Sequence, residues 1–226
     1  MSSKKIGILF CGLVRNFDQT YESCMTNLFQ HNSDFKIDTY LCFWNESFGK
    51  NDYYNKKSVN TEKLIDLYKP KKSMVLNLTE VEKEILVVLN KVLENNRLPM
   101  QGADYVKNSI CAQMFCWKKC LSIVEGEYDL LIKNRFDLQF NKPIALKDVA
   151  VSKNEILCNK DNLYHKHGFS DTFFIAQQKT FFDFMSSFDM LKDYKSSQNL
   201  YAEIVLTNIH RDKNIIASNF GTTIRR

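Results

Sequence analysis

The sequence contains no hydrophobic stretch long enough to cross a membrane. Its apolar runs are short, as at 85–89, whereas a membrane-spanning helix needs about 20 such residues. The amino-terminal segment MSSKKIGILFCG reaches a polar loop too early for the apolar core of a secretory signal. We therefore expect no integral membrane segment and a cytoplasmic location.

A disulfide framework and a strong net charge are also missing. The seven cysteines form neither a disulfide-like spacing nor a C-x-x-C pair, which fits a reducing compartment. Cys111, Cys116 and Cys120 with His165 and His167 would supply zinc-type ligands, but buried free thiols are the favoured interpretation. The net charge is +5 and the lysines are scattered, so we expect a solvated basic surface and no nucleic-acid partner.

Repeats and low-complexity segments are absent, and strand and helix patterns alternate along the chain. Thr79 and Glu82 predict a capping box at the start of a long helix. We expect one domain over 1–226, of α/β class, with a three-layer α/β/α arrangement around a mostly parallel mixed sheet. The predicted strands are 5–12, 36–44, 73–78, 128–140, 155–159, 170–177 and 214–219, and the predicted helices are 17–29, 61–68, 79–95, 104–124, 178–193 and 198–211.

The loop CGLVRNF follows the first predicted strand and precedes a helix. Backbone N–H groups at a helix start, together with an arginine, favour a phosphate or a nucleobase edge. Cys11, Gly12, Leu13 and Arg15 are therefore candidate nucleotide-binding residues. The loop has a single glycine, so it matches neither the Rossmann fingerprint nor a P-loop. Pairing of Arg15 with a surface acid is the alternative.

The segment YDLLIKNRFDLQF at 128–140 runs from apolar residues into charge. On an extended chain, Arg135 and Asp137 would point to the same side, because side chains alternate. At the carboxyl end of a strand, Asp137 would hold a divalent cation that also binds a diphosphate. The Arg135 guanidinium would donate a bidentate hydrogen bond to the phosphate, or would pair with an acid elsewhere.

Weaker patterns supply three more candidates. Asp171 begins a strand after a glycine-bearing loop, where a carboxylate can face a cleft or simply start a turn. Glu203 is the acid in an otherwise apolar helical segment, on either its buried or its outer face. His210, at the end of that helix, would ligate a metal or stabilise the helix terminus, and the second role is favoured.

Trp44 and Gln113 complete the candidate set. Trp44 ends the second predicted strand, where its ring would stack on a base or a sugar, although core packing is the commoner fate. Gln113 and Trp117 lie one helical turn apart, so they would face the same cleft.

Taken in order, these motifs resemble a family of GT-A-like glycosyltransferases from bacteria, phages and large DNA viruses. The resemblance implies a nucleotide-sugar-dependent hexosyl- or pentosyltransferase with a Rossmann-like nucleotide-sugar-binding half at 1–140 and an acceptor-side half at 141–226. Its partners would be a nucleoside-diphosphate sugar and a glycan or glycoconjugate acceptor. The motifs are GLVR at 12–15, LCFW at 41–44, YDLLIKNRFD at 128–137 and SDTFFIA at 170–176, followed by a helix that carries Glu203.

The resemblance also implies a metal site and catalytic carboxylates. Related GT-A enzymes hold Mn²⁺ or Mg²⁺ on the diphosphate with an Asp-x-Asp motif. This sequence has Arg135-Phe136-Asp137 there, so only the second acid matches, and Arg135 itself would neutralise part of the leaving group's charge. Asp171 or Glu203 would act as general base or bind sugar hydroxyls. The alternative is a degenerate protein that binds nucleotide sugars without turnover.

Overall fold

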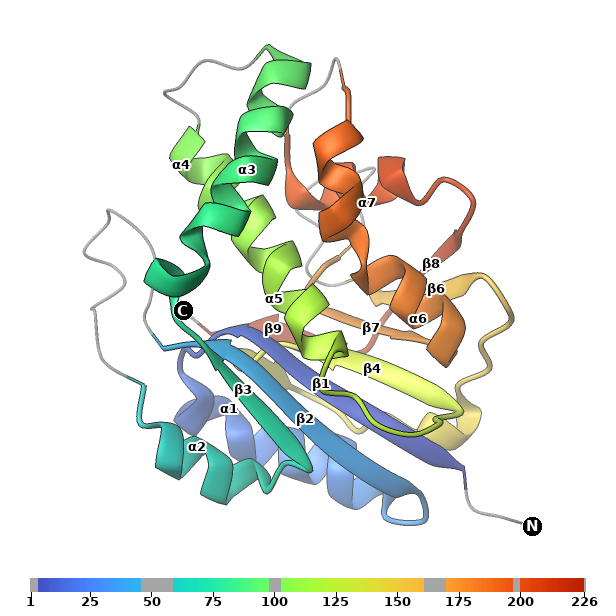
Figure 1. Cartoon of the computed structure of the whole chain (residues 1–226). Helices are drawn as coiled ribbons and strands as arrows, with labels where there is room; N and C mark the ends of the chain where they lie inside the picture. Colours follow the sequence, from blue (N-terminus) through green and yellow to red (C-terminus); the bar gives the residue numbers. More distant parts are fainter. Residues whose placement is uncertain (1–3, 46–58, 98–102, 161–169, 197–199, 226) are drawn as a thin grey trace.

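The computed structural model describes residues 4–45, 59–97, 103–160, 170–196 and 200–225. Within them, a seven-stranded sheet runs in the order β3-β2-β1-β4-β7-β6-β8 (Figure 1). β7 is antiparallel to its neighbours β4 and β6, and the other pairs in the sheet are parallel. The strands are β1 (Lys5–Leu13), β2 (Lys36–Trp44), β3 (Lys72–Leu76), β4 (Leu130–Asn134), β6 (Glu155–Asn159), β7 (Phe173–Ala176) and β8 (Asn214–Ser218).

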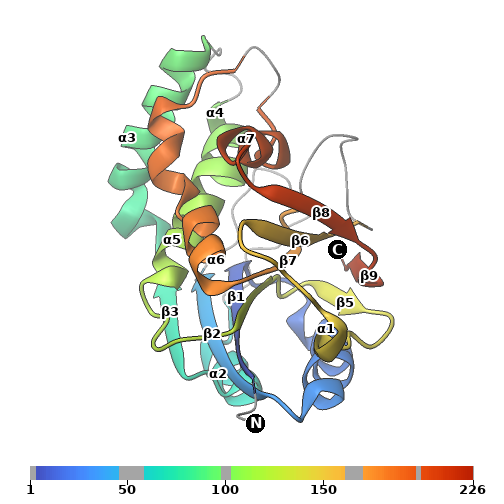
Figure 2. The same ribbon diagram turned by 90° about the vertical axis from the view of Figure 1, so that its right-hand side faces the viewer.

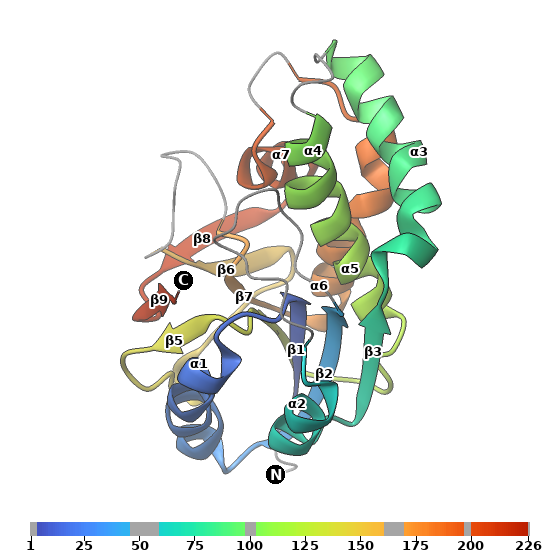
Figure 3. The ribbon, with the colours of Figure 1, turned by 90° about the vertical axis from the view of Figure 1, so that its left-hand side faces the viewer.

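Helices cover both faces of this sheet, which confirms the predicted three-layer α/β/α class (Figures 1 and 3). On one face lie α1 (Phe17–Cys24), with its continuation through Asn32, and α2 (Thr61–Tyr68). The other face carries α3 (Leu78–Asn96), α4 (Ala103–Val106), α5 (Ala112–Leu121), α6 (Gln178–Met185) and α7 (Ala202–Ile209). A π-helical segment, Lys107–Cys111, joins α4 to α5. Short 3₁₀ turns occupy Leu146–Asp148 and Ser187–Asp193.

The central strands are buried on both faces, as expected for parallel strands between two helical layers. One core cluster packs Leu9, Trp44 and Leu131 against α3, α5 and α6. The other packs Ile8, Phe10 and further residues of the sheet against α1 and α2. Alternate residues of each strand therefore serve opposite cores.

The predicted strand at 128–140 is wrong in its extent. β4 ends at Asn134, a turn follows, and β5 (Leu138–Phe140) pairs with β9 (Thr222–Ile224) in a separate two-stranded sheet. Figure 2 shows this small sheet beside α1. The strand is interrupted at 135–137 because the turn there is hydrogen-bonded to other elements, as described below.

The predicted capping box is also wrong, because the N-cap of α3 lies two residues before Thr79. Asn77 is the N-cap, and its side-chain oxygen accepts a hydrogen bond from the Thr79 backbone N–H at 3.1 Å. Its amide donates to Glu80 Oε1 at 3.3 Å. Glu82 instead forms an ion pair with Lys107 of the π-helical segment.

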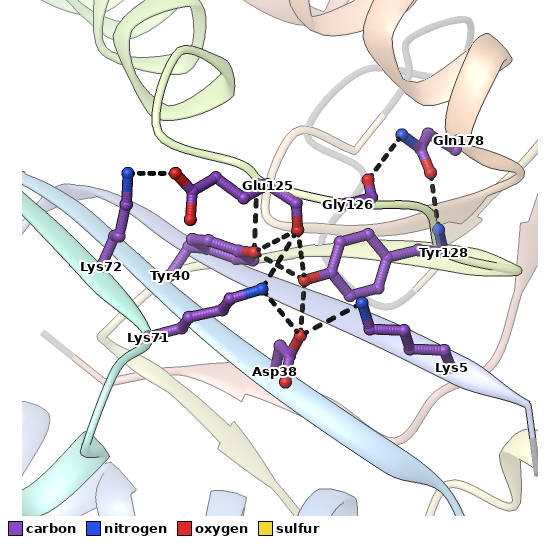
Figure 4. Close-up of polar contacts among 9 residues, drawn as sticks. All are labelled: Lys5, Asp38, Tyr40, Lys71, Lys72, Glu125, Gly126, Tyr128 and Gln178. Carbon is purple, nitrogen blue, oxygen red and sulfur yellow. Dashed lines mark hydrogen bonds and ion pairs between the residues drawn. The ribbon is translucent and has the colours of Figure 1, made fainter.

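A cluster of hydrogen-bonded and charged side chains links neighbouring strands at the amino-terminal edge of the sheet (Figure 4). Tyr128 Oη donates to Asp38 Oδ2 at 2.7 Å and lies 2.5 Å from Tyr40 Oη. Lys71 Nζ lies 3.4 Å and Lys5 Nζ 3.6 Å from the same Asp38 oxygen. Burial alone would raise the pKa of Asp38, but the Tyr128 hydrogen bond and the two ammonium groups outweigh it and hold that pKa below its usual value.

Candidate functional site

The strand order reverses between β1 and β4. From β1 the chain continues through β2 to β3 on one side, whereas β4 joins β1 on the other side. In open α/β sheets, ligands bind beyond the carboxyl ends of the strands at such a switch point. The arrowheads of β1, β2 and β3 point the same way in Figure 3. The edge of the sheet at which these strands and β4 end is called the carboxyl edge below.

Four segments that are distant in sequence meet at the carboxyl edge. Leu13 at the end of β1 is paired with Trp44 at the end of β2. β4 ends there at Asn134, which is paired with Phe173 at the start of the antiparallel β7. Each of the four sequence motifs 12–15, 41–44, 128–137 and 170–176 therefore has one end at this edge of the sheet.

The chain just before α1 has two residues with positive φ, one near the end of β1 and one in the loop that follows. Gly12 has φ +120°, a conformation that side-chain-bearing residues rarely adopt, and a Cβ there would meet no atom within 4 Å. Asn16 has φ 46° and is the N-cap of α1, yet its side chain forms no cap hydrogen bond. Its amide instead donates to the Arg225 main-chain oxygen at 3.2 Å. Cys11 is buried, whereas Leu13 and Arg15 are partly exposed.

A tightly anchored turn follows β4. The Phe136 ring is buried against Phe10 and Phe43, with centroid distances of 5.6 Å and 6.0 Å. The Phe136 carbonyl accepts a hydrogen bond from Thr20 Oγ1 of α1. The Arg225 backbone N–H donates to the Asp137 main-chain oxygen at 2.9 Å. The turn is thus held by the core below it and by the residue that follows β9.

Arg135 and Asp137 are paired with each other across this turn. Arg135 Nε donates to Asp137 Oδ1 at 2.8 Å, and Nη2 donates to Oδ2 at 2.7 Å. The Asp137 side chain is 1% exposed and that of Arg135 is 26% exposed. The expectation that 135–137 is extended, with both side chains on one side of a strand, is wrong, because these residues form a turn and the two side chains form a bidentate ion pair.

The residues around Asp137 do not fit the expected metal site. Both oxygens of its carboxylate already accept hydrogen bonds from a guanidinium, which would compete with a cation. In the described parts of the chain, no group of three His, Cys, Asp or Glu side chains could hold a metal ion. His210, the second predicted ligand, is bonded elsewhere, as described below.

Asp171 is the carboxylate before β7, and two other elements hold it. The Gln113 side-chain amide, on α5, donates to Asp171 Oδ2, which joins two predicted residues. The Lys133 ammonium, on β4, donates to the main-chain oxygen of Asp171. Asp171 itself is 7% exposed. A buried carboxylate is thereby fixed at the carboxyl edge beside a buried cation.

Lys133 is the residue that the sequence analysis missed. It is 1% exposed, and its Nζ lies 5.1 Å from the centroid of the Trp117 ring. Burial lowers its pKa below the usual value, and the nearby Asp171 carboxylate only partly offsets this effect. The sequence pattern could have revealed it, because side chains alternate along a strand. Lys133 therefore lies on the same face of the buried strand as Leu131.

Trp44 and His210 are both buried and packed against aromatic rings. Trp44 is 2% exposed and stacks on Phe115 at 6.2 Å, so it packs in the core. His210 Nε2 is hydrogen-bonded to Ser187 Oγ at 2.8 Å, and its ring packs against Phe184. Burial lowers the pKa of His210 to about 4. Glu203 lies on α7, but its side chain is outside the described residues.

The cysteines are free and buried, in agreement with the favoured interpretation. The Sγ atoms of Cys42 and Cys116 lie 3.9 Å apart, which is well beyond the length of a disulfide bond. Burial raises the pKa of Cys111 to about 12 and raises that of Cys116 as well. His165 and His167 lie outside the described residues. Core packing accounts for these thiols.

The chain matches no known family model and no curated protein. Among solved structures, it resembles the apo-form glycosyltransferase GlyE of Streptococcus pneumoniae TIGR4, with 12% identity and a TM-score of 0.49 over 95% of this chain. It also resembles apo mouse xyloside xylosyltransferase 1, with 9% identity and a TM-score of 0.45 over 96% of this chain and 85% of the mouse chain.

This chain spans 45% of the GlyE structure, which is less than half of it. With TM-scores below 0.5, the two similarities assign neither a family nor an activity to this chain. Across the described residues, no helix combines the length and the apolar character that crossing a membrane requires.

Proposed function

We propose that this protein is a glycosyltransferase that moves a sugar from a nucleoside-diphosphate sugar to a hydroxyl of a glycan or another acceptor. One observation carries the proposal. The four motifs that resemble glycosyltransferases are scattered over the first 176 residues, yet each has one end at the same edge of the sheet. That edge is where α/β sheets of this kind bind ligands.

The side chains at this edge suit the donor. Transfer breaks the bond between the sugar C1 and the β-phosphate oxygen, which keeps the electron pair. Arg135 and the buried Lys133 bring positive charge to the region where this negative charge develops. The partly exposed Arg15 follows the end of β1 at the same edge.

The acceptor needs a base or a hydrogen-bond acceptor for its hydroxyl. Its oxygen forms the new bond to C1, and its proton goes to a carboxylate if the reaction inverts configuration. Asp171 is the candidate among the described side chains, because Gln113 and Lys133 hold it at the carboxyl edge. Glu203 remains a prediction from the sequence.

Thermal-shift measurements with UDP-, GDP- and dTDP-sugars, with and without Mn²⁺, test the proposal. We expect at least one nucleotide sugar to raise the melting temperature, and transfer or slow hydrolysis of that donor to follow in a product assay. The absence of any shift with every nucleotide would contradict the proposal.

Asp171→Asn separates binding from turnover. We expect this variant to keep the thermal shift and to lose transfer by at least about 100-fold, the contribution of a positioned base. Asp34→Asn is the matched control, because Asp34 is exposed just before β2, at the opposite edge of the sheet. Equal activity of the two variants would remove Asp171 from the reaction.

A degenerate binding protein is the second candidate. The pairing of Asp137 with Arg135, where an Asp-x-Asp motif would hold a cation, favours it. Its expected signature is a nucleotide-dependent thermal shift without transfer or hydrolysis over a varied set of acceptors.

A further inference from the structure

The ion pair between Arg135 and Asp137 bears on how a donor diphosphate would be held. The Asp137 carboxylate is buried, and each of its oxygens accepts a hydrogen bond from the same guanidinium. To coordinate a cation, this carboxylate would have to leave a planar bidentate fork. The Arg135 side chain is the more exposed partner of the pair, at 26%.

The turn that carries the pair is anchored by a buried ring and by two hydrogen bonds to its main chain. Phe136 lies between the two residues and is buried against the aromatic cluster of the α1–α2 face. Main-chain oxygens of the turn accept hydrogen bonds from Thr20 of α1 and from the backbone of Arg225. The guanidinium is therefore held in one orientation, which lowers the entropy lost when it binds a ligand.

Positively charged side chains also lie on the described segments at the carboxyl edge. Arg15 follows the end of β1, Lys133 lies near the end of β4, and Arg135 follows β4. Two carboxylates, Asp137 and Asp171, accompany them on these segments.

We propose that the donor diphosphate binds directly to side-chain cations, with Arg135 as the contacting residue, and that binding needs no divalent cation. Asp137 is then a positioning residue that orients the Arg135 guanidinium. Lys133, two residues before Arg135, adds buried positive charge. The proposal rests on the proposed function, since it concerns the same nucleotide-sugar donor.

Calorimetric titration with UDP, GDP and dTDP, in EDTA and in Mn²⁺, tests this proposal. We expect the nucleotide that binds to do so in EDTA with an affinity within a few-fold of that in Mn²⁺. Arg135→Gln should weaken binding by about 10- to 100-fold, because a hydrogen bond to a charged group is lost. Arg135→Lys should recover only part of the lost affinity, since an ammonium cannot form the bidentate hydrogen bonds of a guanidinium.

Lys153→Gln is the matched control for the loss of a cation. Lys153 is exposed just before β6, at the opposite edge of the sheet, so its replacement should leave binding unchanged. Equal weakening in both variants would indicate a general charge effect and would overturn the role of Arg135.

Asp137→Asn distinguishes a metal ligand from a positioning residue. If Asp137 positions Arg135, the ratio of affinities in Mn²⁺ and EDTA stays the same in this variant, while affinity falls in both. If Asp137 is a metal ligand, Mn²⁺ strengthens binding in the wild type and the effect vanishes in the variant, which overturns the proposal. Should the buried substitution prevent folding, the two variants at the more exposed Arg135 decide the question.

The failures of the two proposals are distinguishable. If no nucleoside diphosphate binds in either condition, the proposed function fails. If one binds in Mn²⁺ and is lost in EDTA, the transferase proposal stands and cation-free recognition of the diphosphate is wrong.

Discussion

Replacing Tyr128 by phenylalanine removes one oxygen from the polar cluster at the amino-terminal edge and leaves the ring in place. The lost hydroxyl donates to the ionised Asp38 at 2.7 Å and contacts Tyr40 Oη at 2.5 Å. The ring's other contacts, including Lys5 Nζ at 4.3 Å from its centroid, do not depend on the hydroxyl. The substitution therefore tests one buried hydrogen-bond donor with little change in packing.

The expected loss of unfolding free energy in Tyr128→Phe depends on the hydrogen bonds and ion pairs that remain. A hydrogen bond to a charged group contributes about 1.5–3 kcal/mol. Asp38 keeps its two ammonium neighbours, Lys71 and Lys5, and Tyr40 keeps the Glu125 carbonyl. We therefore expect a loss near the middle of that range, about 2 kcal/mol at neutral pH. For a chain of this size, the loss corresponds to a fall in Tm of about 4–8 °C.

The pH dependence gives the sharper test. The pKa of Asp38 is lowered in the folded protein, so its interactions stabilise the fold above the pKa of an unfolded aspartate, about 3.9. This stabilisation is lost as the pH falls through the lowered, folded-state pKa. Wild type should thus lose more stability on acidification than Tyr128→Phe, and the two proteins should converge at low pH.

Urea unfolding, followed by the fluorescence of the buried Trp44 and Trp117, measures these free energies. Tyr21→Phe is the control, since its hydroxyl donates to a neutral acceptor, the Leu67 carbonyl, at 2.8 Å. A double-mutant cycle with Asp38→Asn should yield a coupling above about 0.5 kcal/mol. Additive effects, or a pH dependence identical to that of Tyr21→Phe, would refute the reasoning.

Three further predictions concern the core. Phe136→Ala should destabilise the fold by about 3–5 kcal/mol in urea unfolding, and a cost below about 1 kcal/mol would contradict its role as the anchor of the turn. The seven buried thiols should resist Ellman's reagent in the native state and react in denaturant; rapid labelling of the native protein would contradict their burial. His210 has a folded-state pKa of about 4, so stability should fall as the pH drops from about 6.5 towards that value, by about 2 kcal/mol at pH ~5. Unfolding free energies of His210→Gln should lack this loss, and an unchanged loss would contradict the assignment.

The sequence predicted the main sheet because buried parallel strands are nearly continuous apolar runs. Segments such as 36–44 and 155–159 match β2 and β6 residue for residue. The break at 135–137 was not predictable in this way, since apolar residues continue on both sides of it. It depends on contacts from Thr20 and Arg225, which are distant in sequence. β9 was missed for a similar reason, because three residues, Thr-Thr-Ile, are too short a pattern and form a strand through pairing with β5.

The candidate site was predicted in location but not in detail. Strand-end motifs identify the carboxyl edge, because parallel strands bring their ends together. The bonds of Asp171 to Gln113 and Lys133 join residues 58 and 38 positions away, and no local pattern specifies them. Spacing also could not reveal that Arg135 and Asp137 bond to each other, since this depends on the turn.

The two edges of the sheet differ in how their charges are compensated. At the amino-terminal edge, Asp38 and Glu125 are each bonded to lysine side chains, so that cluster is complete within the protein. At the carboxyl edge, the buried Lys133 bonds to a neutral main-chain carbonyl. Burying a charge that is incompletely paired is costly, and a bound anion would offset that cost. An anionic ligand should therefore stabilise the protein through the carboxyl edge, and loss of the Asp38 cluster should lower stability without changing the increment that the ligand adds.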